Sequence, residues 1–353
     1  MSNVTRFASI NTKVRVLIGK MLKAEDFNNL IMKDSVGEVA EYLKNKTYYK
    51  NVLRGVDIKD IHRDKLELLL KKHIVNQYEK LIHFFTDEYR KLFRILFIRY
   101  EIEDLKLYIR TLIRGEDLES VRGLVLYSGI YSTVDHDKLS KSKDIKEFVE
   151  NLKDTNYYDM LKPYLNEEGR KLTFYMEMRL DRYYFKSLYD QSSKLDKNDQ
   201  KIFKDLLGKN IDLLNLEWIY RGIKFYKLSS EELINYIIVK GSSMRYDHIK
   251  ELCYSDNEKE LMEKIVDGKY GFLFDNENTV DLFMERRIER YLYFQFKDYY
   301  RKGKMDIIES IAYMHLLEFE VRDIISTIEA IRYDLDKREA KKYLVRRLKG
   351  SDL

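Results

Sequence analysis

Residues Asp144–Tyr158 read Asp-Ile-Lys-Glu-Phe-Val-Glu-Asn-Leu-Lys-Asp-Thr-Asn-Tyr-Tyr, and two other places in the chain carry the same pattern. Ser35–Tyr49 matches this stretch at a constant offset (147 − 38 = 109) without a gap, and Asn257–Gly271 matches it more weakly (260 − 147 = 113). The first two copies share Glu38/Glu147, Glu41/Glu150, Leu43/Leu152, Lys44/Lys153, Tyr48/Tyr157 and Tyr49/Tyr158, and the third keeps Glu260, Glu263, Ile265 and Tyr270. A repeat of about one third of the chain predicts that three related units build the protein.

Each copy carries the start signal of a helix. Ser35, Asp144 and Asn257 each stand three residues before a glutamate, which is the spacing of a capping box. A short side-chain oxygen at such a position can accept from an early helix N–H while the glutamate reaches back to the cap. Behind each cap, apolar residues stand four apart on one predicted face: Val39/Leu43, Phe148/Leu152 and Leu261/Ile265.

A second pattern closes each unit: an acid, an apolar residue, any residue, Asp or Asn, and an apolar residue. It occurs at Glu101–Leu105, Asp212–Leu216 and Glu320–Ile324. The apolar residues that continue from it are Ile102, Leu105, Ile109 and Leu112, then Leu213, Leu216, Tyr220 and Ile223, then Val321, Ile324, Ile328 and Ile331. This spacing predicts one buried face on each closing helix. We expect the acids beside that face to tie the helix to a neighbour rather than to act as acid–base pairs, because Asn215 replaces the acid in one copy.

A third pattern, Glu177–Tyr183, recurs as Glu285–Tyr291 (285 − 177 = 108). In the first unit only Tyr78 remains of it. The arginines of this pattern, Arg179/Arg182 and Arg287/Arg290, are the expected partners of the closing carboxylates, because a buried charge must be paired.

The composition is that of an almost wholly helical protein. The 353 residues include 1 proline and 14 glycines, and proline is the residue that a helix interior tolerates least. We therefore expect an all-α fold with helical units at 1–117, 118–228 and 229–353. The first unit begins with a helix over Val4–Lys23, and Gly115 suits the left-handed residue that follows a helix.

The chain is expected to end in a basic helix over Asp336–Lys349. A solvated last helix is the favoured interpretation, because its cations suit the negative end of the helix dipole. Contact with acidic lipid or an acidic partner is the alternative. The cations concerned are Lys337, Arg338, Lys341, Lys342, Arg346, Arg347 and Lys349.

Charge and cysteine content narrow the class of protein. Lys and Arg total 65 against 60 for Asp and Glu, so the formal net charge is only +5. This indicates a mixed-sign surface and not a nucleic-acid-binding polycation. The single Cys253 excludes an internal disulfide framework and suits a reducing compartment. Apolar runs such as Leu92–Ile98 are far shorter than the roughly 20 residues that span a bilayer, so we expect a soluble protein.

The sequence predicts no catalytic, cofactor-binding or metal-ligating residues and no cofactor. Its glycine spacing lacks the phosphate-loop, dinucleotide and nucleophile-elbow patterns. Because no two histidines stand four residues apart, they are expected to pack or to face solvent. Cys253 is expected to be buried and to pack. The many tyrosines are expected to pack half-buried, with the hydroxyl reaching solvent, rather than to stack on bases. The histidines are His62, His73, His83, His136, His248 and His315.

These features resemble the C subunit of the prokaryotic V-type (A/V-type) ATPases, whose eukaryotic counterpart is the V-type ATPase d subunit. The resemblance covers essentially the whole chain. It rests on the three degenerate helical units, the low proline content, the Asn11-Thr-Lys-Val-Arg15 segment of the first helix, and the closing elements at Glu101, Asp212 and Glu320.

The resemblance implies three helical domains with pseudo-threefold symmetry in a funnel-like body that carries no nucleotide and does no chemistry. Such a protein caps the membrane rotor ring on the cytoplasmic side as a peripheral part of the complex. It receives the D and F proteins of the central stalk, and the membrane stator protein is a further candidate partner. Torque for ATP-driven or ATP-producing H⁺ or Na⁺ transport passes through it, with no nucleic acid and no small-molecule substrate.

A helical-repeat scaffold that binds regulatory protein partners is the alternative function. Repeats of that class are usually shorter, about 34–47 residues.

Overall fold

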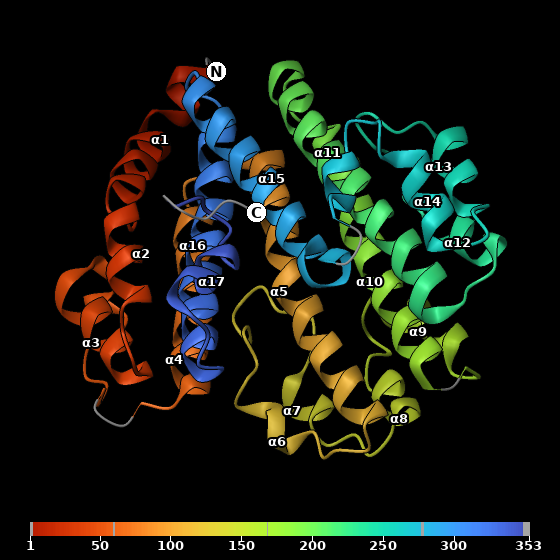
Figure 1. Ribbon diagram of the computed structural model, residues 1–353, viewed down its shortest axis with the longest axis horizontal. Coiled ribbons are helices and arrows are strands. Elements are labelled where there is room, and N and C mark those ends of the chain that lie inside the picture. Colours follow the sequence, from red (N-terminus) through yellow and green to blue (C-terminus); the bar gives the residue numbers. More distant parts are fainter. Residues whose placement is uncertain (1–2, 59–60, 168, 277–278, 349–353) are drawn as a thin grey trace. The chain divides into compact units, whose positions relative to one another are not determined.

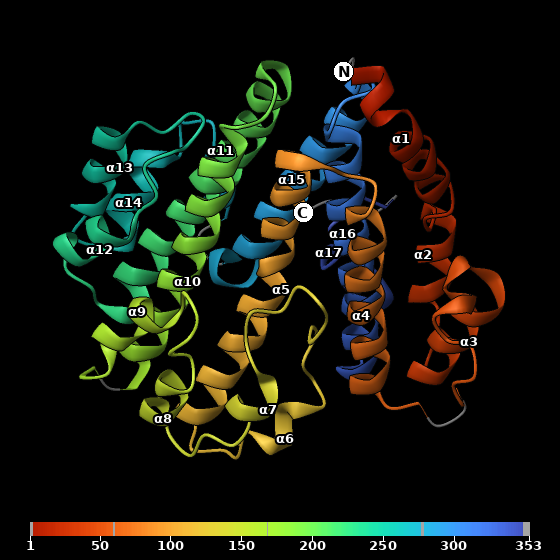
Figure 2. The ribbon, with the colours of Figure 1, turned by 180° about the vertical axis from the view of Figure 1, so that it is seen from behind.

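The computed structural model of the chain describes residues 3–58, 61–167, 169–276 and 279–348, and within these ranges every regular element is a helix (Figures 1 and 2). The predicted all-α fold is confirmed. The chain divides into two compact units. We call Met1–Phe84 with Phe272–Leu353 the split unit, and Phe85–Gly271 the middle unit.

The split unit is organised around its longest helix, α16. Its helices are α1 (Asn3–Gly19), α2 (Ala24–Ile31), α3 (Val36–Lys46), α4 (Arg63–Ile82), α15 (Val280–Lys302), α16 (Ile308–Arg332) and α17 (Lys337–Lys342). All the others pack against α16, and Figure 2 shows α4 running alongside it. Residues on several sides of α16, including Ile311, Leu317 and Ile324, are buried, as expected of a helix that is apolar nearly all round.

The middle unit is built on three long helices. They are α5 (Asp87–Ile113), α10 (Gly169–Ser192) and α11 (Lys197–Arg221), and α10 packs against both of the others. Shorter elements follow α5 and α11: α6 (Glu119–Arg122), α7 (His136–Leu139), α8 (Ile145–Glu150), α9 (Tyr158–Leu161), a 3₁₀ turn (Lys162–Tyr164), a π-helical turn (Gly222–Tyr226), α12 (Ser230–Tyr236), α13 (Tyr246–Cys253) and α14 (Glu258–Ile265). The apolar faces predicted for the closing helices lie on α5, on α11 with the π-helical turn that follows it, and on α16. Their residues are buried except for the half-buried Leu112 and Ile331.

The three predicted helix starts have the same hydrogen bonds. Ser35 and Asp144 each accept from the backbone N–H three residues on, and Asn257 accepts from Lys259 and Glu260. In each copy the glutamate accepts from the N–H of the residue before the cap, at 3.2, 2.9 and 2.7 Å, and not from the cap itself as predicted. The apolar pairs behind the caps are buried in all three copies.

The tyrosines at the ends of these copies correct the predicted register. Thr47 and Thr155 both accept from the N–H two residues on, which is Tyr49 in one copy and Tyr157 in the other. Both tyrosines are buried, at 0% and 2% exposed. Tyr49 therefore corresponds to Tyr157 (157 − 49 = 108), and the gapless match of Tyr49 to Tyr158 was wrong by one residue.

A left-handed residue lies shortly before each predicted unit boundary. Gly115 has φ +72° after α5, and its N–H bonds to the carbonyl of Leu112. Lys227 has φ +51° after the π-helical turn. The partition into 1–117, 118–228 and 229–353 and its pseudo-threefold arrangement stay predictions.

The predicted basic helix Asp336–Lys349 was wrong beyond Lys342, where α17 ends. Leu344, Val345 and Leu348 are buried in the split unit, and Arg346 is only 7% exposed. These apolar residues interrupt the run of cations. Because they are buried, the segment after Lys342 packs against the split unit instead of forming a solvated helix. Lys349 lies outside the described residues.

Candidate functional site

The first closing carboxylate, Glu101 on α5, is 2% exposed and surrounded by donors. Its Oε1 accepts from the Tyr157 hydroxyl and the Thr133 hydroxyl, each at 2.6 Å. Its Oε2 accepts from the Ser132 hydroxyl at 3.0 Å and from the Thr133 N–H at 2.5 Å. Glu101 therefore fastens α5 to the loop before α7 and to the tyrosine before α9.

The second, Asp212 on α11, has the same kind of partners. It accepts from the Tyr270 hydroxyl at 2.8 Å and from the N–H groups of Ser243 and Met244 at 2.8 and 3.4 Å. Burial raises the pKa of this carboxyl, and the hydrogen bonds oppose the rise. A Cβ at Gly241 would collide with Asp212 Oδ1, so only glycine fits there.

The third, Glu320 on α16, is fully buried and is held by two tyrosines. Its Oε1 accepts from the Tyr48 and Tyr49 hydroxyls at 2.8 and 3.0 Å, and its Oε2 accepts from the Leu22 N–H at 2.7 Å. Burial raises its pKa, and nearby Arg346 opposes this.

The three carboxylates follow one rule. Each is bound by a tyrosine that ends the capped stretch of the next repeat along the chain, and Glu320 of the last repeat is bound by the first. The predicted tie between helix and neighbour is present. Both carboxylate oxygens of each of these three acids accept at least one hydrogen bond, as expected of a buried acid with a structural role.

The Asp or Asn of the closing pattern is buried in all three repeats, and its hydrogen-bond partners differ from one repeat to the next. Asp104 accepts from the N–H groups of Leu126 and Tyr127 at 2.8 and 2.9 Å, and burial raises its pKa to about 7. Asn215 donates to the carbonyl of Ile238 and accepts from the N–H of the same residue, both at 2.9 Å.

Asp323, at the third of these positions, has a cation. It accepts from the Val345 N–H at 2.5 Å and from Arg346 Nε at 2.6 Å. Arg346 also donates to the Leu22 carbonyl and lies over the Phe27 ring, 3.6 Å from its centroid. Arg346 was predicted to be solvated and is instead the buried partner of an acid.

The expected pairing of the repeated arginines with these acids was wrong. Arg290 donates to the carbonyls of Lys342, Leu344 and Val345, and Arg182 donates to the carbonyl of Asn235. Tyrosine hydroxyls and backbone N–H groups already satisfy most of the carboxylate oxygens, and Arg182 and Arg290 satisfy carbonyl groups of the chain.

The histidines show no metal-binding geometry within the described residues, where no group of three or more potential ligands gathers. His315 stacks on Phe296 at 4.2 Å, and His136 lies 3.3 Å from the Tyr108 hydroxyl. Burial lowers the pKa of His73 to about 4. Cys253 is buried, and burial raises its pKa to about 12.

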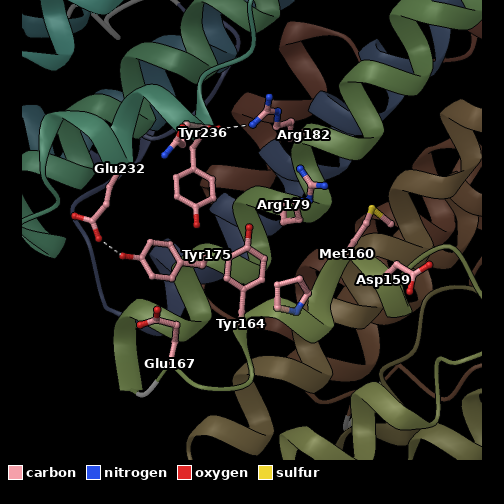
Figure 3. A pocket seen from close by; sticks show the side chains of 11 residues that line it. Asp159, Met160, Tyr164, Glu167, Tyr175, Arg179, Arg182, Glu232 and Tyr236 are labelled. Atoms are coloured by element: carbon pink, nitrogen blue, oxygen red, sulfur yellow. Dashed lines mark hydrogen bonds between the residues drawn. The ribbon is translucent and has the colours of Figure 1, made fainter.

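An open pocket of about 460 Å³ lies within the middle unit, between α9, α10 and α12 (Figure 3). Its walls carry the arginines of the repeated pattern, Arg179 and Arg182, together with Tyr164, Tyr175 and Tyr236. No sequence motif indicates this pocket, because its residues come from segments that are up to 77 positions apart (236 − 159 = 77).

The family described as ATP synthase (C/AC39) subunit matches residues 10–343. Among relatives, the C subunit of the A-type ATP synthase of Methanosarcina acetivorans is 23% identical over 341 residues, covering 97% of this chain and 93% of the relative. The protein of the same name from Methanobrevibacter smithii is 25% identical, with 89% and 81% covered, and that from Methanosarcina mazei is 24% identical, with 73% and 70% covered. The resemblance drawn from the repeats is confirmed: the chain belongs to the ATP synthase (C/AC39) subunit family.

Proposed function

We propose that this chain is the central-stalk rotor subunit of a V-type (A/V-type) ATPase, which couples the rotating shaft to the membrane ion-translocating ring. The chain is a structural, non-catalytic subunit in this role. The observation that supports the proposal most is the family match, which extends over residues 10–343.

The buried ties suit a part that transmits torque. Such a part must deform little under load, and dense packing of helices provides stiffness. Glu101, Asp212 and Glu320 each fix a long helix to a capped segment through several hydrogen bonds. Bonds between a buried carboxylate and its donors are costly to break, because the acid would be left unsatisfied.

The contact with the membrane is peripheral in this proposal. None of the helices in the described residues is both long enough and apolar enough to cross a bilayer. We infer that the protein binds the ring at the membrane surface. A ring of identical proteins need not share the repeat of this chain, so shape and many polar contacts contribute more than a few anchors.

Affinity purification from native membranes tests the proposal. A tagged chain is expected to bring down the ring proteins and the D and F proteins of the central stalk. Raising the salt concentration is expected to release it from the ring, because exposed charge pairs are screened.

Two results would contradict this function. Recovery of only unrelated regulatory proteins would favour a free-standing scaffold. A complex that stays fully assembled in high salt, yet comes apart when the detergent is changed, would contradict the polar contact with the ring.

A further inference from the structure

We propose that the pocket between α9, α10 and α12 binds an organic phosphate monoester that carries a flat ring. Arg179 and Arg182 would bind the phosphate, and the tyrosines of the pocket would pack against the ring (Figure 3). This inference is independent of the coupling function proposed above.

The two arginines that line the pocket, Arg179 and Arg182, support the binding of a phosphate group. Arg179 is half-buried and has no hydrogen bond or ion pair with any residue in the part of the chain that the structure describes. Arg182 stands three residues further along α10, so both guanidinium groups project from one face of the helix. Arg182 donates one N–H to the Asn235 carbonyl, which leaves others for a ligand. Two planar guanidinium forks match a dianionic phosphate in geometry and in charge.

The second copy of the arginine pattern shows what such a position binds. Arg287 of the split unit corresponds to Arg179 (287 − 179 = 108). Arg287 donates to the Leu273 carbonyl at 2.8 Å and to the Thr279 hydroxyl at 3.1 Å. There the chain itself supplies the oxygen acceptors. In the middle unit Arg179 lines a pocket instead, and an oxygen-bearing ligand would take the place of those acceptors.

The aromatic wall selects for a flat ring. Tyr175 and Tyr236 are stacked, with ring centroids 5.3 Å apart and an angle of 10° between their planes. Tyr164 lies beside Tyr175, with the two ring centroids 5.9 Å apart. Figure 3 shows these rings along one side of the pocket and Arg179 opposite. Offset stacking on such a wall favours a planar ligand over an aliphatic one.

The acids around the pocket do not cancel its cations. Glu232 already accepts from the Tyr175 hydroxyl and the Ser229 N–H, and it lies 3.6 Å from Lys171. Asp159 and Glu167 are exposed, so water screens their charge. The volume of about 460 Å³ is within the range of sites for small organic ligands.

Calorimetric titration of the full chain with phenyl phosphate tests this inference, with inorganic phosphate and phenol as comparison ligands. Phenyl phosphate is expected to bind at one site and more tightly than either comparison ligand. Arg179→Met is expected to weaken its binding about tenfold or more, because hydrogen bonds between charged groups are lost. Arg54→Met, which removes an exposed arginine of the split unit, is the matched control and should leave binding unchanged.

The circular dichroism spectrum and melting temperature of Arg179→Met should equal those of the wild type, because Arg179 has no partner to lose among the described residues. The proposal is overturned if phenyl phosphate gives no binding heat up to about 10 mM. It is equally overturned if Arg179→Met binds as tightly as the wild type, or if inorganic phosphate binds as tightly as phenyl phosphate. Failure of the membrane purification described above would leave each of these results unaffected.

Discussion

Replacing Asp104 by asparagine should change how stability depends on pH. Asp104 is 1% exposed, accepts from two backbone N–H groups, and lies at the position where the next repeat has Asn215. Burial raises the pKa of the folded-state carboxyl from 3.8 to about 7. The folded protein therefore holds a proton at Asp104 that the unfolded chain releases, so the stabilising effect is full below pH about 4 and is lost as pH rises through about 7.

The size of the effect follows from these two pKa values. At pH 5 the folded state gains about 2.5 kcal/mol from holding the proton, and at pH 8 it gains almost nothing. The free energy of unfolding of the wild type, relative to Asp104→Asn, should thus fall by about 2.5 kcal/mol between pH 5 and pH 8. The variant also carries a constant cost on the order of 1–3 kcal/mol, because the amide NH₂ faces one of the two N–H donors.

Urea unfolding followed by circular dichroism at pH 5, 6, 7 and 8 measures this difference. Comparing two chains at each pH cancels the other titrating groups. Ile109→Val, a buried and uncharged change on the same helix, is the control and should shift stability equally at every pH. A wild-type advantage over Asp104→Asn that stays constant from pH 5 to pH 8, or that grows toward pH 8, would refute the reasoning.

Three further changes test the buried ties by thermal or urea unfolding. Tyr157→Phe should cost about 1.5–3 kcal/mol, because it removes the hydroxyl that donates to a buried carboxylate; the same change at half-buried Tyr158 should cost less than about 1 kcal/mol, and equal losses at the two positions would count against the tie. Arg346→Met should cost about 3–5 kcal/mol by leaving its buried acid without a cation, and a loss below about 1 kcal/mol would show that the pair contributes little. Gly241→Ala should destabilise by at least about 1–3 kcal/mol because its Cβ would collide with a carboxylate oxygen, whereas Gly123→Ala meets no atom within 4 Å and should be neutral.

Short-range patterns predicted much of the fold. The caps at Ser35, Asp144 and Asn257 and the buried stripes of α5, α11 and α16 depend on residues a few positions apart, so periodicity and capping rules are enough to find them. The one-residue error in the tyrosine register arose because the match was extended without a gap. Aligning Thr47 with Thr155 would have revealed the shift.

The partners of the buried acids could not be predicted in this way. Tyr49 and Glu320 lie 271 positions apart, and the packing of α1 to α4 against α16 brings them together. Arg346 was missed because it stands in a run of cations. Leu344 and Val345 interrupt that run, and such an apolar pair is the signal that the segment is buried.

The same long-range contacts set an order for folding during synthesis. Residues 3–82, which form α1 to α4, leave the ribosome before the middle unit, yet α16, against which they pack, is Ile308–Arg332. At about 5–20 residues per second, roughly 10–50 s separate the two events. The middle unit, Phe85–Gly271, is continuous in the chain and can complete its core within that interval. Helices α1 to α4 are thus made before the middle unit but can complete their packing only after it, and their apolar faces have to be kept from aggregating until α16 is made.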